Sequence, residues 1–425
     1  MDIKELYNLY KINYKVTTDT RSDLTDSIFF ALKGDNFNGN EYAIDAIKKG
    51  AKYAVVDEKI SSLDDRIILV DNVLKTLQDL AGFHRQCLGI PIIALTGSNG
   101  KTTTKELVYS VLREKFNCVA TKGNLNNHIG VPLTLLSLKP ETEIAVIEMG
   151  ANHPNEIKML CEIALPDYGY ITNFGKVHLE GFGSLEGVIR AKSELYDHLR
   201  ERNKIVFVNN NDHTQVEQTK GIKKISFGTI NSDFPVTFVQ ADPFVELKFN
   251  DIEVTSNLIG KYNYLNIATA IAIGEYFNIS DKLIKKGIEK YIPTNNRSQI
   301  IDKGTNKIIM DAYNANPNSM EVAIENLAQL SEKKKIAILG DMFEIGENSL
   351  LEHQNIVDLI VRSKIDKCIL IGEIFAETKI ENKNIVQFKT YDEFKKNIHK
   401  LKIEDATILI KASRGMALER VLELI

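Results

Sequence analysis

A loop rich in glycine and hydroxyl side chains is the strongest chemical signal in the sequence. It reads Ile92-Ile93-Ala94-Leu95-Thr96-Gly97-Ser98-Asn99-Gly100-Lys101-Thr102-Thr103-Thr104. An apolar run is followed by a turn with two glycines and then by a segment predicted to be helical. Glycines let backbone N–H groups approach phosphate oxygens, and the amino end of a helix carries partial positive charge. We therefore predict a nucleotide site in which Lys101 reaches the phosphates and Thr102 meets Mg²⁺.

This phosphate loop is a variant. The strict pattern G-x-x-x-x-G-K-[ST] is not met, because Leu95 stands where the first glycine should be. The strand before the loop and the helix after it are both predicted, as the pattern requires. An ordinary strand-to-helix turn is the alternative interpretation.

Two further polar side chains follow other apolar segments that are expected to be strands. Glu148 ends the segment 144–147, and His178 lies in the loop after the segment 168–172. Ligands of open parallel sheets bind outside the carboxyl ends of the strands, and a carboxylate there is suited to hold Mg²⁺. A solvated glutamate and a solvated loop histidine are the alternatives. We predict that both side chains lie beside the phosphate loop.

Lys192 interrupts an apolar stripe on a predicted helix, residues 185–199. The stripe consists of Leu185, Val188, Ile189, Leu195, Tyr196 and Leu199. Lys192 fills the gap in this stripe. A lysine on a core-facing stripe must extend its amine to solvent, be paired, or change its charge. Extension to solvent is the simple alternative; the other prediction is an amine that is modified or bound into the phosphate and metal site.

Apolar and helical segments alternate along the chain, which predicts an α/β fold of three domains. The central domain, 88–293, is expected to have a P-loop-type, mostly parallel sheet with helices on both faces. A small N-terminal α/β domain, 1–87, and a C-terminal Rossmann-like α/β domain, 294–425, flank it. The connections near residues 85–90 and 293–296 are candidate hinges. The expected strands comprise residues 29–32, 53–56, 90–95, 117–120, 144–149, 168–172, 204–208, 236–239, 245–249, 252–255, 307–310, 335–339, 367–371 and 407–410.

Composition excludes several classes of protein. The formal net charge of −4 disfavours a nucleic-acid-binding surface. The four cysteines are scattered, without metal-site spacing or the density of a disulfide framework, which is typical of free thiols in a reducing cytoplasm. The first residues lack the layout of a signal peptide, and no apolar run has the roughly 20 residues that a membrane span needs. We expect a cytoplasmic enzyme.

Several stretches together resemble the Mur ligases. They are residues 96–106, 121–132, 148–152 and 178–184, with Ala191-Lys192. The resemblance covers essentially the whole chain. Residues 311–317 and 339–346 are most similar to the members that add D-Ala-D-Ala to UDP-N-acetylmuramoyl-tripeptide. The diaminopimelate-adding members carry a D-N-P-R-type motif, which this sequence lacks.

The resemblance implies an ATP-dependent ligase with an acyl-phosphate intermediate and, as substrates, UDP-N-acetylmuramoyl-tripeptide and D-Ala-D-Ala. Two Mg²⁺ ions and a carbamylated Lys192 are implied as well, and a monomer is expected. Lys101, His178 and Lys192 are the implied catalytic residues. The implied ATP-contacting residues are Gly97, Asn99, Gly100, Lys101, Thr102, Thr103, Asn263, Arg297 and Asp311. The implied metal ligands are Thr102, Glu148, His178 and Lys192. The implied substrate-binding residues are Thr20, Arg21, Ser22, Asn38, Asn127, Tyr313, Asn314, Asn316 and Arg414.

Two positions depart from the family pattern. Tyr262 replaces the histidine of the segment Gly-x-His-Asn-x-x-Asn, which here covers residues 260–266, and His128 stands where an acidic residue is common. Four alternatives to the dipeptide ligase stay open: a Mur ligase that adds one amino acid, an enzyme like folylpolyglutamate synthase, a P-loop NTPase without ligase activity, and a UDP-sugar-binding protein with a vestigial ATP site. The first domain disfavours the folate alternative. The third residue of the muramoyl peptide, lysine or diaminopimelate, also stays open.

Overall fold

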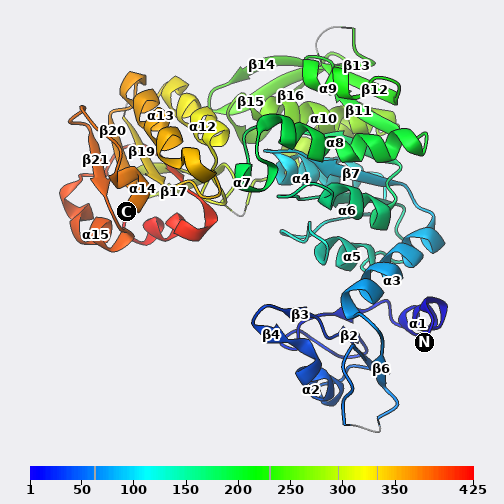
Figure 1. Ribbon diagram of the computed structural model, residues 1–425. Coiled ribbons are helices and arrows are strands. Elements are labelled where there is room, and N and C mark those ends of the chain that lie inside the picture. The colour runs from blue at the N-terminus through cyan, green and yellow to red at the C-terminus, as the bar shows by residue number, and fades with distance from the viewer. Residues whose placement is uncertain (62–63, 229–230, 295, 333) are drawn as a thin grey trace.

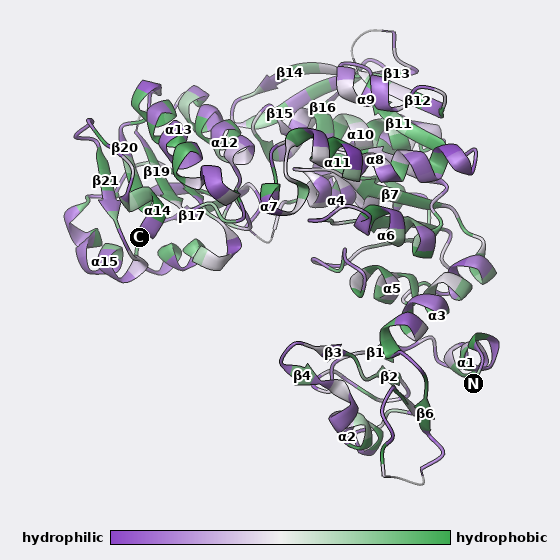
Figure 2. Cartoon of the chain, viewed as in Figure 1, coloured by the Kyte–Doolittle hydropathy of each residue, from purple (hydrophilic) through white to green (hydrophobic). Residues whose placement is uncertain are grey.

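The chain folds into three α/β units that follow one another in space (Figure 1). The computed structural model describes residues 1–61, 64–228, 231–294, 296–332 and 334–425. Asn295, which belongs to the expected linker 293–296, lies outside the described residues. Figure 2 shows that the strands of the central sheet are largely hydrophobic, whereas the helices around them alternate between hydrophobic and hydrophilic residues. This is the pattern expected of helices that cover a buried parallel sheet.

The N-terminal unit is a small parallel sheet with the strand order β1-β2-β5-β6. Helix α2 packs on β5, and a short hairpin, β3–β4, projects from the unit. The elements are α1 (Ile3–Tyr10), β1 (Val16–Thr17), β2 (Ile28–Phe30), β3 (Lys33–Gly34), β4 (Phe37–Asn38), α2 (Ala43–Lys48), β5 (Tyr53–Val56) and β6 (Ile67–Leu69).

Helix α3 (Val73–Leu88) joins this unit to the central domain. It packs against α1 on one side and against the central helices α5 and α6 on the other. Arg85 donates hydrogen bonds to the backbone carbonyls of Ala164 and Leu165 and forms an ion pair with Asp167 at 2.7 Å. The stretch 85–90 is therefore tied to the central domain, which corrects the expected hinge there. The joint to the small sheet comes earlier, between β6 and α3.

Replacing Arg85 with methionine is expected to lower the free energy of unfolding by about 2–3 kcal/mol. The side chain of Arg85 is only 8% exposed, and its loss removes a donor from the buried carbonyl of Ala164 and from the half-buried carbonyl of Leu165. Asp167 keeps Lys204 as a partner, which limits the cost. Urea denaturation followed by circular dichroism measures the change. The matched control is Arg66→Ala, an exposed arginine, for which we expect less than about 0.5 kcal/mol; equal losses in both variants would contradict the role of Arg85.

The central domain is built on a seven-stranded, entirely parallel sheet with the order β13-β12-β11-β10-β7-β9-β8. Helices α4, α10 and α11 cover one face, and α3, α5, α6 and α8 cover the other (Figure 1). The strands are β7 (Ile92–Thr96), β8 (Cys118–Ala120), β9 (Ile144–Glu148), β10 (Tyr168–Ile171), β11 (Ile205–Asn209), β12 (Lys223–Gly228) and β13 (Phe234–Pro235). The helices are α4 (Lys101–Leu112), α5 (Gly130–Leu135), α6 (Glu156–Ala164), α7 (Leu179–Phe182), α8 (Leu185–Glu201), α9 (His213–Gln218), α10 (Asn263–Tyr276) and α11 (Asp281–Lys290).

A three-stranded antiparallel sheet follows at the edge of this domain. Its strands are β14 (Thr237–Ala241), β15 (Phe244–Phe249) and β16 (Ile252–Ile259). It packs against α10 and α11, so its buried side chains join the core on that face. The sheet leads the chain into α10, whose amino end reaches the phosphate loop.

The C-terminal domain has a six-stranded sheet with the order β17-β18-β22-β19-β20-β21. All pairs are parallel except β17 with β18, so the predicted mostly parallel sheet is confirmed. The strands are β17 (Gln299–Lys303), β18 (Asn306–Met310), β19 (Lys335–Gly340), β20 (Lys367–Ile371), β21 (Ile385–Phe388) and β22 (Thr407–Lys411). The helices are α12 (Pro317–Gln329), α13 (Ser349–Arg362), α14 (Glu373–Ala376) and α15 (Tyr391–Asn397).

The expected elements of the central sheet agree with the structure to within about two residues, and one detail of α8 was wrong. Leu185, assigned to the apolar stripe of this helix, is 37% exposed at its first turn. The strands that were not predicted are β1, β3, β4, β6, β12, β13, β17 and β21. Most of them are very short, and β12 begins with two lysines. Among the described residues, no helix is long and apolar enough to cross a membrane.

Candidate active site

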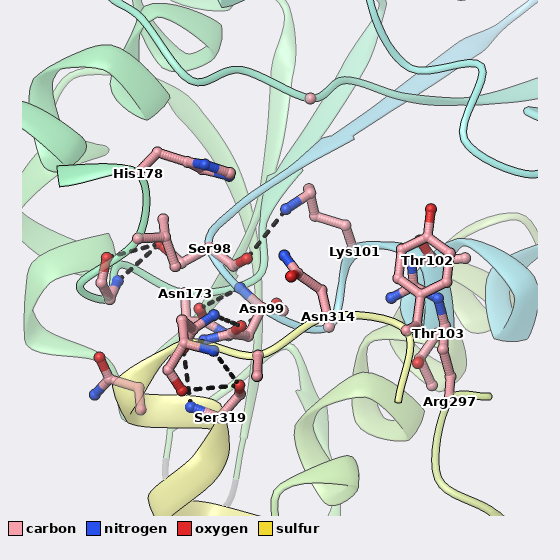
Figure 3. Close-up of a pocket in the computed structure, with 18 of the residues that line it drawn as sticks. Ser98, Asn99, Lys101, Thr102, Thr103, Asn173, His178, Arg297, Asn314 and Ser319 are labelled. Carbon is pink, nitrogen blue, oxygen red and sulfur yellow. Dashed lines mark hydrogen bonds between the residues drawn. The ribbon is translucent and has the colours of Figure 1, made fainter. Parts of the chain in front are cut away.

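A cavity of about 680 Å³ lies between the central and the C-terminal domains. Three neighbouring strands of the central sheet, β10, β7 and β9, end at it. Loops from the C-terminal domain close its other side (Figure 3). The predicted site residues that line it are Asn99, Gly100, Lys101, Thr102, Thr103, Asn127, Glu148, His178, Asn263, Arg297, Asp311, Tyr313, Asn314 and Asn316.

The phosphate loop follows β7 and depends on its two glycines. Gly97 and Gly100 have φ angles of 141° and 80°, which other residues rarely adopt. A Cβ on Gly97 would lie 2.0 Å from the hydroxyl oxygen of Thr172. A Cβ on Gly100 would lie 2.7 Å from the side-chain oxygen of Asn266. Gly97 thus lets the loop pack closely against Thr172, whereas Gly100 lines the cavity at the start of α4.

Lys101 lies across the phosphate loop and donates to the carbonyls of Gly97 at 2.7 Å and Ser98 at 3.1 Å (Figure 3). Burial lowers its pKa to about 8, the negative charge of Glu148 acts in the opposite direction, and Arg297 lowers the pKa further. The amine therefore remains mostly protonated at neutral pH. A buried cation held beside a row of backbone N–H groups is suited to bind phosphate oxygens.

Glu148 stands at the end of β9 and is 1% exposed. Its Oε1 accepts hydrogen bonds from the hydroxyl of Thr102 at 3.2 Å and from the amide of Asn126 at 2.8 Å. Its Oε2 is buried and has no hydrogen-bond partner among the residues that the structure describes. A buried carboxylate oxygen without a donor, next to a threonine hydroxyl, is suited to a hard divalent cation. Asn126 was not predicted, although it belongs to the stretch 121–132 that carries the family resemblance.

His178 lies on the opposite side of the cavity, in a left-handed backbone conformation with φ of 48°. Its Nδ1 pairs with Glu344, which comes from the C-terminal domain. Burial lowers the pKa of His178, while the charge of Glu344 raises it. Among the described residues, no three histidine, cysteine, aspartate or glutamate side chains are grouped closely enough to hold a metal ion. The structure thus brings His178 to the cavity without joining it to Glu148 in a preformed metal cluster.

Lys192 is buried on α8, at 1% exposure, as the gap in the apolar stripe predicts. Its amine donates to the carbonyl of Ala151 at 3.0 Å and lies 5.2 Å from the centre of the Phe182 ring. Burial lowers the pKa of Lys192 well below its ordinary value, and the charge of Lys101 lowers it further. The alternative of an amine extended into solvent is wrong, because the side chain is enclosed between α8 and the loop after β9.

The C-terminal domain contributes side chains from the carboxyl ends of β18 and β22. Asp311 forms an ion pair with Lys411 at 2.5 Å, and Lys411 also donates to the carbonyl of Asn314. The guanidinium of Arg297 stacks on the Tyr313 ring, 3.6 Å from its centre. Together they form one polar wall of the cavity, which faces the phosphate loop and consists of Arg297, Asp311, Tyr313, Asn314 and Lys411.

Side-chain amides connect the two domains across the cavity. Asn316 donates to the side-chain oxygen of Asn99 at 2.7 Å, and Asn173 accepts from the backbone N–H of Asn99. Asn318 accepts from the backbone N–H of Lys176 at 3.0 Å. Asn173 and Asn318 were not predicted. Asn173 lies two residues beyond the end of β10, at the carboxyl end of a parallel strand, where ligand-binding side chains are expected. That position could have identified it from the sequence, whereas nothing in the local sequence marks Asn318.

Asn263 lies at the amino end of α10 and is 2% exposed. Its amide donates to the carbonyl of Ile259, and its oxygen accepts from Asn266, which in turn accepts from the hydroxyl of Thr104. These hydrogen bonds connect α10 to α4, the helix that follows the phosphate loop. Asn263 therefore helps to fix that helix and also lines the cavity.

Seven predicted site residues do not line the cavity. Two of them, Gly97 and Lys192, are described above, and the other five lie elsewhere on the molecule. Thr20, Arg21 and Ser22 form an exposed turn, in which Arg21 pairs with Asp19. Asn38 lies in the hairpin β3–β4 and lines a separate, shallow depression of the N-terminal unit. Arg414 is 59% exposed at its side chain and pairs with Glu419. The N-terminal group belongs to a different domain, and Arg414 does not line the cavity between the central and C-terminal domains.

Known proteins resemble the chain over nearly its full length. The family "Mur ligase middle domain" matches residues 95–274, and "Mur ligase, glutamate ligase domain" matches residues 296–414. The UDP-N-acetylmuramoyl-tripeptide–D-alanyl-D-alanine ligase of Bacillus subtilis is 36% identical over 423 residues, which cover 96% of this chain and 92% of the relative. The crystal structure I of MurF from Acinetobacter baumannii superposes with a TM-score of 0.88 at 30% identity, covering 96% of this chain and 92% of that one. The MurF ligase from Thermotoga maritima in complex with ADP gives a TM-score of 0.84 at 28% identity, covering 96% of both chains. On this evidence the chain belongs to the Mur ligase family.

Proposed function

We propose that this protein joins D-Ala-D-Ala to UDP-N-acetylmuramoyl-tripeptide at the expense of ATP, a step of peptidoglycan precursor synthesis. The observation that carries the proposal is the cavity itself, in which the phosphate loop and Glu148 face a polar wall from a second domain. Full-length relatives that are named for this reaction support it, and one related MurF structure is a complex with ADP.

The three units divide the substrates among them. The UDP-sugar binds the N-terminal unit, 1–87, through a surface that includes Thr20, Arg21, Ser22 and Asn38. ATP binds the central domain, 88–293, and the C-terminal domain, 294–425, brings the dipeptide. The enzyme acts as a monomer in the cytoplasm.

The carboxyl end of β9 is suited to hold Mg²⁺. The fit rests on the buried Oε2 of Glu148, which has no donor, and on the adjacent hydroxyl of Thr102. Thr102 and Glu148 would hold one ion, and His178 with a carbamylated Lys192 would hold a second. When bound, the ions neutralise charge on the phosphates.

The reaction has two steps. A carboxylate oxygen of the muramoyl tripeptide attacks the γ-phosphorus of ATP; a P–O bond forms, the bond to ADP breaks, and an acyl phosphate results. The amine of D-Ala-D-Ala then attacks the acyl carbon, inorganic phosphate leaves, and the nitrogen loses a proton. Lys101 holds the phosphate oxygens, and the loop N–H groups orient them. No protein nucleophile is needed, so positioning and charge neutralisation supply the catalysis.

Lys192 reacts with CO₂ to give a carbamate. Burial lowers the pKa of Lys192 and so favours its neutral amine. The nitrogen of that amine bonds to the carbon of CO₂ and loses one proton; counted from the ammonium form, two protons leave, and a buried cation becomes an anion. Its burial, with the Ala151 carbonyl as its hydrogen-bond partner among the described residues, supports this modification, because an unpaired ammonium there is costly. After incubation with ¹³C-bicarbonate, we expect a carbamate signal in the carbon-13 NMR spectrum of the wild type.

We expect Lys192→Met to lose that signal and to lower turnover by about 10- to 100-fold. The control is Lys105→Met, which removes another fully buried lysine and should leave the signal. A signal that persists in Lys192→Met, or that is absent from the wild type, would contradict the modification.

Phosphate release tests the proposed reaction. It is measured with ATP, Mg²⁺ and UDP-N-acetylmuramoyl-tripeptide, with and without D-Ala-D-Ala, and the product is identified by mass spectrometry. Release that needs both acceptors and yields the pentapeptide supports the proposal. Tripeptides with lysine or diaminopimelate as the third residue, compared side by side, identify the natural substrate. Release that is indifferent to both acceptors would replace the proposal with a simple NTPase.

A further inference from the structure

Tyr262 connects the central domain to the start of the C-terminal domain. It immediately precedes α10, and its ring lines the cavity. Its hydroxyl lies 2.9 Å from the hydroxyl of Ser298, and either group can donate. Ser298 follows the interdomain connection and stands directly before β17. The bond therefore joins the phosphate-loop side of the cavity to the exit of that connection.

Ser298 is held in an uncommon backbone conformation. Its φ is 51°, in the left-handed region, and the residue is 7% exposed. Such a conformation is disfavoured for a residue with a side chain and persists where its surroundings impose it. Two contacts impose it here: the Tyr262 hydroxyl on the side chain, and a hydrogen bond from the Ser298 N–H to Oδ1 of Asp311 at 3.1 Å.

The residue before Ser298 is Arg297, whose guanidinium faces the cavity. Because adjacent residues share a peptide plane, the conformation of Ser298 sets the direction from which Arg297 enters the cavity. The ring of Tyr313 supports the guanidinium, and the backbone N–H of Tyr313 is bonded to the carbonyl of Asn296 at 3.2 Å. Tyr262 thus contacts the side chain of Ser298, the residue that follows Arg297 in the chain.

We propose that Tyr262 is a positioning residue, which fixes the exit of the interdomain connection through Ser298 and so holds Arg297 in place against the nucleotide. The proposal rests on the proposed ligase function. It assigns a role to Tyr262, which stands where the family pattern has a histidine. Burial, followed by the charge of Asp311, raises the pKa of Tyr262, so the phenol stays neutral and keeps its proton for this hydrogen bond.

Removing either hydroxyl tests the proposal. We expect Tyr262→Phe and Ser298→Ala each to lower kcat by about fivefold, the effect of one hydrogen bond between neutral groups. The KM for ATP should change by less than about twofold, because the phosphate-loop contacts come from the central domain alone. The double variant should be no slower than either single variant, since both remove the same bond.

Tyr264→Phe is the matched control. Tyr264 lies two residues further along α10, and its hydroxyl donates to the carbonyl of Val236 in the core of the central domain. We expect this variant to keep the kcat of the wild type even where its melting temperature falls. A loss of kcat that follows melting temperature across all variants would overturn the proposal.

Amide hydrogen exchange reports on the connection without requiring turnover. The Ser298 N–H should exchange about fivefold faster in Tyr262→Phe than in the wild type, with or without ADP, and should be unchanged in Tyr264→Phe. If the wild type binds ADP but forms no pentapeptide, the ligase function fails while this measurement still decides the role of Tyr262.

Three further outcomes would overturn the proposal: unchanged kcat and exchange in Tyr262→Phe, additive losses in the double variant, or a raised KM for ATP in Tyr262→Phe with Ser298→Ala silent. The last outcome would mean that Tyr262 contacts the nucleotide itself.

Discussion

Replacing Lys101 with methionine is expected to lower kcat by about 10³-fold. The methionine keeps most of the length of the side chain and removes its charge. A preorganised donor aimed at developing negative charge, in a site shielded from water, is worth on the order of 10²–10³ in rate, and phosphoryl transfer depends on such charges. Phosphate release in the presence of both acceptors measures the effect.

The fold should survive this replacement. Burial already disfavours the charge of Lys101, so its removal relieves a desolvation cost while two loop carbonyls lose a donor. We expect the melting temperature to change by only a few degrees. The control is Lys115→Met, at a lysine just beyond α4 that contacts the carbonyls of Phe277 and Asn278 on the surface. It should keep the turnover of the wild type. A Lys101→Met enzyme within tenfold of the wild type would contradict the phosphate-binding role.

The sequence predicted most of the central domain because its strands are buried on both faces. Segments such as 144–147 are apolar throughout, and each ends in a polar residue at the sheet edge where ligands bind. Lys101, Glu148 and His178 could thus be assigned to one site because each lies at or just beyond the carboxyl end of a predicted strand. Lys192 was found by the opposite signal, a charge in an apolar stripe, and its burial confirms that reasoning.

The contacts between domains could not be predicted in the same way. Glu344 meets His178 from 166 positions further along the chain, and Asn318 meets the backbone of Lys176 from 142. Neither acceptor sits in a local pattern that distinguishes it from a solvated side chain. Which residues they contact depends on how the sheets of the central and C-terminal domains face each other. The periodicity of apolar residues and the turn residues of a sequence do not contain that information.

The joint at α3 shows the same limit. The sequence pattern changes at Ile90, and this suggested a linker and a candidate hinge near residues 85–90. The structure instead anchors Arg85 to the far end of α6 and to Asp167, because a long side chain at the end of a helix can satisfy carbonyls of a neighbouring element. The change of pattern marked the start of the central domain, but neither helix α3 nor the contacts that hold its end were predicted.

Replacing Glu148 with glutamine is the second change with a large expected effect, a fall in kcat/KM on the order of 10³-fold. Glutamine keeps the oxygen that accepts from Thr102 and Asn126, so the local hydrogen bonds survive. It replaces the partnerless Oε2 by an NH₂ group, which repels a cation instead of binding it. Loss of one carboxylate ligand removes several kcal/mol of charge stabilisation, and each 1.4 kcal/mol is about a factor of ten.

The measurement is phosphate release over a titration of Mg²⁺, together with the rise in melting temperature that ADP produces with and without Mg²⁺. In the wild type the metal should increase that rise, and in Glu148→Gln it should not. Glu143→Gln is the matched control, because Glu143 stands just before the other end of the same strand, where it accepts from the N–H of Asn117. Its rate and its response to Mg²⁺ should equal those of the wild type.

The stability of the Glu148→Gln protein without ligands separates a functional role from a structural one. A carboxylate that is 1% exposed with one oxygen unbonded costs free energy in the folded state. Neutralising it should leave the melting temperature unchanged or raise it. A protein that is as stable as the wild type and about 10³-fold slower would mean that the folded chain retains this carboxylate for the cation. A large fall in melting temperature with normal turnover would instead make Glu148 a structural residue and remove it from the metal site.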